Sequence, residues 1–295
     1  MGNMCSGETR DEDSNMPVDT HNKSSHRKSN SSLSDEDIGN LENQKRYEDG
    51  NREYVSEDGS VYKGDKLNGA RHGQGTLTWP DGSVYSGTWD NNLFHGEGEF
   101  RHSSGDHFRG NFVNGKAEGY GVYIHKDGTK YEGDWHEDLQ HGRGKETKED
   151  GSTYEGDFLH GKKNGQGVFQ WSDGSSYNGE WENNMSDGFG TYNWPDGSYY
   201  RGMFSSNKMH GKGFFDWGNG KTYDGDFFQD KKQGKGLFKW PKGVSYEGSW
   251  FDNQKHGIGV IYLNNKTRKG LWDKGKRVKW LDEEVDGFDD DYLID

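Results

Sequence analysis

Apolar and polar positions alternate along most of this chain, and the alternation recurs every 23 residues. A typical stretch places Tyr177, Gly179 and Trp181 at every second position. Successive side chains of a β-strand point to opposite faces, so this spacing puts all three residues on one face. Lysine, glutamate, serine, threonine and asparagine fill the positions between them. The pattern predicts short strands with one aromatic face and one polar face.

The period marks nine consecutive copies from Asp58 to Asn264, and a tenth, degraded copy follows. Most copies begin with Asp-Gly: Asp58-Gly59, Asp81-Gly82, Asp127-Gly128, Asp150-Gly151, Asp173-Gly174 and Asp196-Gly197. Between alternating segments, Asp-Gly favours a tight turn in which both central residues have positive φ. Each copy is therefore predicted to hold two strands joined by a loop of roughly six or seven residues, with the Asp-Gly turn leading to the next copy.

The amino-acid composition taken alone would suggest a disordered chain rather than a folded repeat. Leu, Ile, Val and Phe number 43 of 295 residues and the net charge is −14, values typical of a disordered chain. The 11 Trp and 16 Tyr residues argue against disorder. Of the 47 glycines, 42 lie within 58–279. An aromatic ring that lies over a glycine of a neighbouring strand would bury surface without a leucine-rich core.

The charges separate the chain into three regions. Residues 1–57 hold 13 acidic and 7 basic residues, residues 58–279 hold 30 of each, and residues 280–295 hold 8 acidic residues and no base. We expect a disordered tail over 1–46, which lacks aromatic residues, a repeat array over 47–279, and an acidic tail over 280–295. The net acidity argues against nucleic-acid binding.

The first six residues fit the myristoylation pattern Met-Gly-x-x-x-Ser/Thr, with Gly2 as the acceptor. The single cysteine, Cys5, lies three residues later. One myristoyl chain binds membranes only marginally, so a palmitoyl chain on Cys5 would make the anchor stable. The alternative is an ordinary tail with an incidental cysteine. The sequence has no apolar run long enough to span a membrane and no secretory h-region. One cysteine fits a reducing compartment.

The motif Asp127-Gly128-x-x-Tyr131-x-Gly133-x-Trp135, followed by His141-Gly142-x-Gly144, resembles the MORN (membrane occupation and recognition nexus) repeat. The resemblance covers about three-quarters of the chain. It implies a single elongated antiparallel sheet with a grooved aromatic face, and often a homodimer formed through the terminal repeats. The aromatic residues expected to line a partner groove are Tyr85, Trp89, Tyr131, Trp135, Tyr177, Trp181, Tyr246 and Trp250. Lys66, Arg268, Glu146 and Lys148 replace aromatic residues of the pattern, so the end copies resemble caps and the fourth copy is a candidate weak point.

Three features that suggest chemistry have simpler interpretations. His72, His95, His141, His210 and His256 are evenly spaced, but Glu118, Asn164, Asp187 and Gln233 take their place in other copies, which argues against a metal site. Each Gly-x-Gly lacks the Lys-Ser/Thr of a phosphate loop. The sequence also lacks a nucleophile and base set at catalytic spacing. We expect no catalytic residues, no metal and no cofactor.

A basic run near the end comprises Lys266, Arg268, Lys269, Lys274, Lys276, Arg277 and Lys279. It could contact anionic lipid or an acidic partner, pair with the acidic segment Asp282 to Asp295, or be a solvated cap. The leading functional hypothesis is a non-enzymatic scaffold that links the cytoplasmic face of a membrane to cytoskeletal or signalling partners. The alternatives are an axonemal subunit of the radial-spoke-head type, which would place the protein in a cilium, and a phosphoinositide-binding module.

Overall fold

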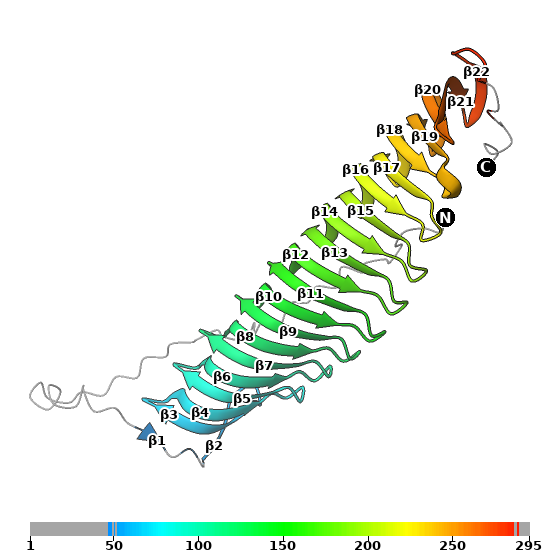
Figure 1. Ribbon diagram of the computed structural model, residues 1–295. Coiled ribbons are helices and arrows are strands. Elements are labelled where there is room, and N and C mark those ends of the chain that lie inside the picture. Colours follow the sequence, from blue (N-terminus) through cyan, green and yellow to red (C-terminus); the bar gives the residue numbers. More distant parts are fainter. Residues whose placement is uncertain (1–46, 49, 51, 286–287, 289–295) are drawn as a thin grey trace, which may run out of the picture. The chain divides into compact units, whose positions relative to one another are not determined.

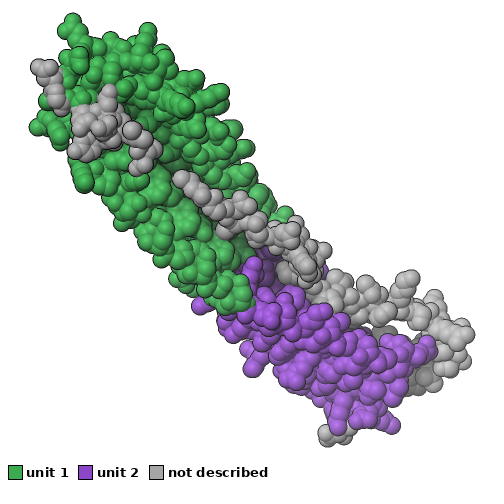
Figure 2. Space-filling model, turned by 90° about the vertical axis from the view of Figure 1, so that its right-hand side faces the viewer, with its two compact units in different colours: residues 1–10, 150–157, 162–295 green, residues 11–149, 158–161 purple. Residues whose placement is uncertain are grey.

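The chain is all-β in the computed structural model, which describes residues 47, 48, 50, 52–285 and 288. Antiparallel strands joined by short connections follow one another (Figure 1), so the predicted fold class of tandem antiparallel β-hairpin repeats is confirmed. The chain forms two compact units, coloured separately in Figure 2. The N-terminal unit has its described residues within 47–149 and 158–161, and the C-terminal unit within 150–157 and from 162 onward. In this described part, no helix is long and apolar enough to span a bilayer.

In the N-terminal unit, neighbouring strands from β3 to β10 pair antiparallel, and β1 and β2 both pair with β3. The strands are β1 (Tyr47–Glu48), β2 (Glu53–Val55), β3 (Val61–Leu67), β4 (Ala70–Thr78), β5 (Val84–Asp90), β6 (Leu93–Arg101), β7 (His107–Val113), β8 (Lys116–Ile124), β9 (Lys130–His136) and β10 (Leu139–Thr147). The next strand, β11 (Thr153–Leu159), has residues in both units.

In the C-terminal unit, neighbouring strands from β12 to β22 pair antiparallel. The strands are β12 (Lys162–Gln170), β13 (Ser176–Glu182), β14 (Met185–Asn193), β15 (Tyr199–Ser205), β16 (Lys208–Asp216), β17 (Thr222–Phe228), β18 (Lys231–Lys239), β19 (Ser245–Phe251), β20 (Gln254–Leu263), β21 (Lys266–Asp273) and β22 (Lys276–Trp280). A 3₁₀ turn, η1 (Pro241–Gly243), lies between β18 and β19.

The two strands of each copy are joined by a two-residue turn, so the predicted loop of six or seven residues was wrong. Between β13 and β14, Asn183 and Asn184 have φ angles of 49° and 69°, as a type I′ turn requires. The error arose because the residues before each Gly-x-Gly, such as Leu93 and His95, belong to the second strand rather than to a loop. A register shift follows the glycine pair inside a hairpin, as it does between Gly179 and Trp181, and a bulge of this kind bends a strand.

The Asp-Gly segments lie in wider connections between copies. In the loop between β4 and β5, the Gly82 N–H donates to the Trp79 carbonyl at 3.0 Å, and the Ser83 N–H donates to Asp81 Oδ1 at 2.8 Å. Gly82 has a φ of 91°, whereas Asp81 is not left-handed. The expectation of two positive φ angles at Asp-Gly was therefore wrong. The aspartate instead accepts a backbone N–H two residues along the chain, which lowers the pKa of its carboxyl.

The glycines inside the strands provide space for tyrosine rings. Gly179 pairs with Gly190 across β13 and β14. A Cβ atom added to Gly190 would lie 2.5 Å from the Tyr177 Oη atom, and one added to Gly179 would lie 2.5 Å from the Gly190 Cα atom. The Tyr177 hydroxyl donates to the Glu180 carbonyl at 2.9 Å, which holds the ring in place. The predicted packing of rings over glycines is confirmed.

A ladder of edge-to-face aromatic pairs forms the core of each unit. The Tyr177 ring centre lies 5.2 Å from that of Trp181 in its own strand and 5.0 Å from that of Phe204 in the next copy, at 87° and 85°. Such pairs contribute about 0.5–1.5 kcal/mol beyond their burial. In the C-terminal unit the ladder runs from Tyr154 to Trp272, and in the N-terminal unit from Tyr62 to Phe158. Each tyrosine thus joins two copies.

The second residue of each tight turn also joins neighbouring copies. The Asn184 N–H donates to the Lys163 carbonyl at 3.0 Å, and the Lys163 N–H donates to Asn184 Oδ1 at 2.8 Å. Asp230 makes the same pair of bonds with Met209. Burial raises the pKa of the Asp230 carboxyl, whereas an asparagine in this place carries no charge to desolvate.

Candidate partner-binding surfaces

The residues predicted to line a partner groove form the aromatic ladder. The side chains of Tyr85, Trp89, Tyr131, Trp135, Tyr177, Trp181, Tyr246 and Trp250 are all buried, with exposed fractions of 0 to 7 %. Their rings pack on one another and on the glycines. Their role in partner binding stays a prediction, and in this conformation a partner would first meet the side chains that lie around them.

Half-buried indole rings border the ladder in the C-terminal unit. Trp171, Trp194, Trp217 and Trp240 directly follow the second strand of successive copies, and each contacts the aromatic residue two positions earlier, as in the 4.4 Å pair of Phe238 and Trp240. These tryptophans were not predicted as site residues. The signal was available, because the same position holds tryptophan in four consecutive copies of this unit.

Lys232 and Lys255 lie among these rings, and Lys163 lies over the Tyr154 ring of an earlier copy. Lys232 Nζ is 4.5 Å from the ring centre of Trp250 and 4.7 Å from that of Phe238. Lys255 Nζ is 5.1 Å from the ring centre of Trp240, and the Lys255 residue is only 8 % exposed. Burial lowers the pKa of both amines; that of Lys232 falls to about 8 because Lys255 and Lys221 also repel its charge. These lysines were not predicted as site residues.

An apolar patch lies on the otherwise polar face of strands β14 to β16. We define the β14–β16 patch as Phe189, Tyr199, Arg201, Met203 and Phe214. Phe189 is 45 % exposed and pairs across the strands with Met203, which is 41 % exposed. The Tyr199 and Phe214 ring centres are 5.9 Å apart, and the Arg201 Cζ atom lies 5.6 Å from the Phe189 ring centre.

The other copies show that the fold does not require this patch. At the position of Met203 they carry Asp65, Thr88, Asn111, Asp134, Asp157, Glu180, Asp226 and Ser249. At the position of Phe189, the neighbouring copies carry Gln166 and Lys212. The same face carries exposed apolar residues in other copies, such as Tyr120 and Ile258, but an exposed cluster of apolar residues such as this patch is typical of an interaction site.

The predicted basic run divides between two faces of the last strands. Arg268 lies on the aromatic face, is 7 % exposed, contacts the Trp280 ring at 4.2 Å and pairs with Asp282 at 3.5 Å. Its neighbour Lys269 is exposed, and its backbone N–H donates to the same Asp282 carboxylate. Lys266, Lys274, Lys276, Arg277 and Lys279 are exposed. The run thus contacts the start of the acidic segment through Arg268 and Lys269.

The departures from the repeat pattern have local explanations at both ends. In the first copy, Lys66 replaces an aromatic residue, and its Nζ lies 3.5 Å from the Tyr54 ring centre. In the last, Arg268 replaces the tyrosine and stacks on Trp280. In the fourth copy, Glu146 and Lys148 lie near the end of the segment that runs to residue 149 in the N-terminal unit. Whether that copy is weaker stays a prediction.

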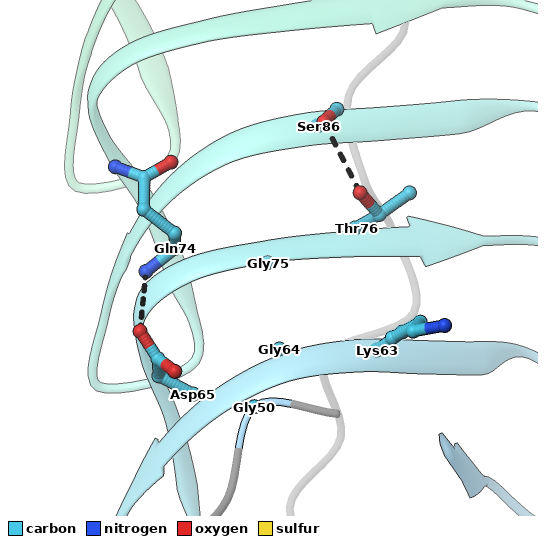
Figure 3. A pocket seen from close by; sticks show the side chains of 8 residues that line it. All are labelled: Gly50, Lys63, Gly64, Asp65, Gln74, Gly75, Thr76 and Ser86. Carbon is cyan, nitrogen blue, oxygen red and sulfur yellow. Dashed lines mark hydrogen bonds between the residues drawn. The ribbon is translucent and has the colours of Figure 1, made fainter. Parts of the chain in front are cut away.

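A polar hollow of about 490 Å³ opens on the N-terminal unit (Figure 3). Its lining includes Lys63, Asp65 and Gln74, and the Gln74 N–H donates to Asp65 Oδ2 at 3.2 Å. The hydroxyls of Thr76 and Ser86 lie 3.1 Å apart and bond to each other. These hydrogen bonds link polar groups of the lining to one another.

The remaining predictions concern lipidation and metal binding. Gly2 and Cys5 lie outside the described residues, so acylation of the two stays a prediction. The evenly spaced histidines lie in strands rather than loops, as His95 does in β6 and His141 in β10. Within the part of the chain that the structure describes, no group of three or more His, Cys, Asp or Glu residues has a metal-binding arrangement.

These features define a protein built from tandem β-hairpins that bury aromatic rings along one face. Comparison with protein-family models matches the MORN repeat over residues 62–84, 85–107, 108–130, 131–153, 154–176, 177–199, 200–222, 223–245 and 246–268. The chain belongs to the MORN repeat family, whose repeat is a non-enzymatic module with a binding or scaffold role.

Comparison with curated proteins finds no match. Among solved structures, the chain is similar to the E1021V mutant of the TCP10 domain of Danio rerio CPAP, at 12% identity and a TM-score of 0.38, covering 67% of this chain and 93% of that one. It is also similar to the TCP domain of Drosophila melanogaster SAS-4 (dCPAP), solved with a proline-rich motif of Ana2, at 13% identity and a TM-score of 0.34, covering 59% and 88%. Likeness at this level carries no argument about function.

Proposed function

We propose that this chain is a non-enzymatic scaffold, held at the cytoplasmic face of a membrane by acyl groups on Gly2 and Cys5, that binds a cytoskeletal or signalling protein through its repeats. The observation that carries the binding role is the β14–β16 patch. It presents apolar surface at positions where the other copies are mostly polar. The membrane role rests on the Met-Gly-x-x-x-Ser start, with a cysteine in position for a second acyl chain.

The chemistry of the patch defines the partner it would fit. Phe189, Met203 and Phe214 would bury apolar side chains of a partner. Arg201 is exposed at the centre of the patch, and none of the described residues offers it a carboxylate. A partner segment with apolar side chains and one carboxylate would therefore pair with both features, since charge complementarity sets orientation at such a surface.

The binding role is tested with Met203→Asp, because aspartate stands at this position in other copies and the fold accommodates it. Proteins crosslinked to the wild-type chain in cells are compared with those crosslinked to the variant, and the retained partner is purified for a direct affinity measurement. We expect at least a tenfold loss of affinity for the variant. The matched control is Ser249→Asp, the equivalent position two copies later. Equal binding by Met203→Asp and wild type would remove the patch from the proposal.

The membrane role is tested by fractionating cells that express the full chain. Gly2→Ala should move the protein from the membrane pellet to the supernatant, and Cys5→Ser should weaken membrane retention while leaving myristoylation intact. Unchanged fractionation of Gly2→Ala would contradict the acyl anchor and favour the axonemal alternative. A homodimer through the last copies remains part of the proposal, and light scattering that gives the mass of one chain would remove it.

A further inference from the structure

Lys232 and Lys255 on the aromatic face have no counterion among the residues that the structure describes. Neither Lys232 Nζ nor Lys255 Nζ contacts a carboxylate or a hydrogen-bond acceptor among the described residues. Cation–π contacts return about 0.5–2 kcal/mol, less than an ammonium group loses when it leaves water. A bound anion would compensate both charges. The two ammonium groups therefore lack a compensating negative charge.

The fold itself does not require lysine at these two positions. At the equivalent position, two other copies of the same unit carry Ser186 and Met209, both buried, and a third carries Lys163. Lys221, which lowers the pKa of Lys232, likewise occupies a position that holds serine in the three preceding copies. Three cations thus gather around β17 to β20, at positions where other copies carry serine or methionine, and a bound anion would compensate their charge.

The described end of the chain returns to this same face. After β22, the Asp282 carboxylate pairs with Arg268, and the Phe288 ring centre lies 5.6 Å from that of Trp280. Arg268 occupies the tyrosine position of the last copy, and the Tyr246 ring of the copy before it packs on Trp272 at 5.0 Å. The segment that follows Phe288 therefore starts beside the aromatic ladder of the C-terminal unit.

We propose that residues 289–295 dock along the aromatic face of the C-terminal unit, with aspartate carboxylates at Lys255 and Lys232. This segment, Asp289-Asp-Asp-Tyr-Leu-Ile-Asp295, combines four acidic residues with three apolar ones. The carboxylates match the unpaired ammonium groups. The apolar side chains match the half-buried indoles of Trp217 and Trp240.

The length of the segment suffices for this path. Lys255 Nζ lies over the Tyr246 ring of β19, and Lys232 Nζ over the Tyr223 ring of β17. With neighbouring strands about 4.8 Å apart, these rings lie about 10 Å and 19 Å from β21, where Arg268 lies. Seven extended residues span about 23–25 Å. The docked segment would cover this face, so another ligand would have to displace it. This inference does not depend on the scaffold role or on the acyl anchor.

The test uses the full chain with all four tail aspartates neutralised by Asp289→Asn, Asp290→Asn, Asp291→Asn and Asp295→Asn. A synthetic peptide of residues 289–295 is titrated by fluorescence anisotropy into this variant and into wild type. We expect the peptide to bind the variant at least tenfold more tightly, because the native tail competes in wild type. Binding should weaken as salt is raised. Equal affinity for the two proteins, or no binding to either, would overturn the proposal.

The site is then tested by adding Lys232→Met and Lys255→Met to the neutral-tail variant. Methionine stands at this position in another copy, so the variant should keep its melting temperature while losing the peptide. The control pair, Lys235→Met and Lys239→Met, removes two exposed lysines of β18 and should bind as before. Retained binding by the Lys232/Lys255 variant would contradict the assignment. If an unrelated peptide of the same charge bound equally well, the tail would not be the specific ligand, and an acidic partner would be favoured. If the wild-type chain formed a dimer that Lys232→Met/Lys255→Met lost, the ligand of this face would be a second copy of the chain.

Discussion

At the scale of single residues, glycine and tyrosine act as one unit in this protein. Gly179 and Gly190 have no positive φ, so conformational freedom does not explain them. They are needed because the Tyr177 ring lies against both, and because their backbones approach closely. The glycines of the Asp-Gly segments are different: nothing lies within 4 Å of a Cβ added to Gly197, but its φ is 86°. The same residue type thus has two physical roles.

Gly190→Ala tests the first role. The added methyl would overlap the Tyr177 ring, which Trp181 and Phe204 hold at both sides, so we expect a loss of about 1–3 kcal/mol in the free energy of unfolding. Asn178→Ala, on the opposite face of the same region, should change it by less than about 0.5 kcal/mol. The measurement is urea denaturation of the full chain. Equal losses in both variants would show that the ring can move aside.

At the scale of the element, the hairpin could be predicted from sequence but its turns could not. A spacing of two assigned the faces of the strands correctly, because alternation is a property of any extended chain. The tight turn was predicted at Asp-Gly because this dipeptide favours such turns locally. The tight turns fall instead at pairs such as Asn183-Asn184, which also tolerate left-handed φ. Local preference could not decide between two turns in one period, whereas the bonds from Asn184 to the preceding copy do.

Asp230→Asn tests these bonds between hairpins. Burial raises the folded-state pKa of Asp230, so wild-type stability falls as pH rises through that pKa. The amide keeps the acceptor for the Met209 N–H and has no charge to bury. We therefore expect Asp230→Asn to stabilise the chain by up to about 1 kcal/mol near pH 7 and to have no effect near pH 3, where the carboxyl is protonated.

The reciprocal variant, Asn253→Asp, provides the control for this prediction. It introduces the charge at the equivalent turn of the next copy, so it should destabilise the chain near neutral pH and not in acid. Denaturation curves at both pH values measure the two effects. A stabilisation by Asp230→Asn that is the same at both pH values would show that desolvation of the carboxylate is not its cause.

At the scale of the whole molecule, the groove residues show where sequence reasoning ended. Periodicity placed Tyr177 and Trp181 on one face, but it did not show that the rings cover one another. Their burial follows from the ladder, in which each ring contacts the next copy edge to face, and from side chains such as Phe94 and Met209 that pack beside it. A sequence pattern within one copy cannot predict which residues contact the neighbouring copy.

Because contacts link only neighbouring copies, damage should remain local. Tyr223→Ala removes a ring that joins Phe227 and Trp250, and we expect a cost of about 3–5 kcal/mol. Hydrogen exchange should speed up in β16 to β19 and stay unchanged in β12 to β14. The exposed Phe228 on the opposite face of β17 provides the control variant, Phe228→Ala. A uniform increase across the C-terminal unit would show global rather than local cooperativity.

The ladder has one more consequence, for the face that does not take part in it. Tyrosine, glycine and tryptophan stabilise each hairpin through the aromatic face. Residues on the other face, such as Met203 and Arg201, are therefore not needed for the stability of the fold. The residues of this face can therefore be substituted in one hairpin without changing the fold of its neighbours. Moving the five residues of the β14–β16 patch to the equivalent positions one period along should carry its binding specificity 23 residues down the chain while leaving the scaffold unaltered.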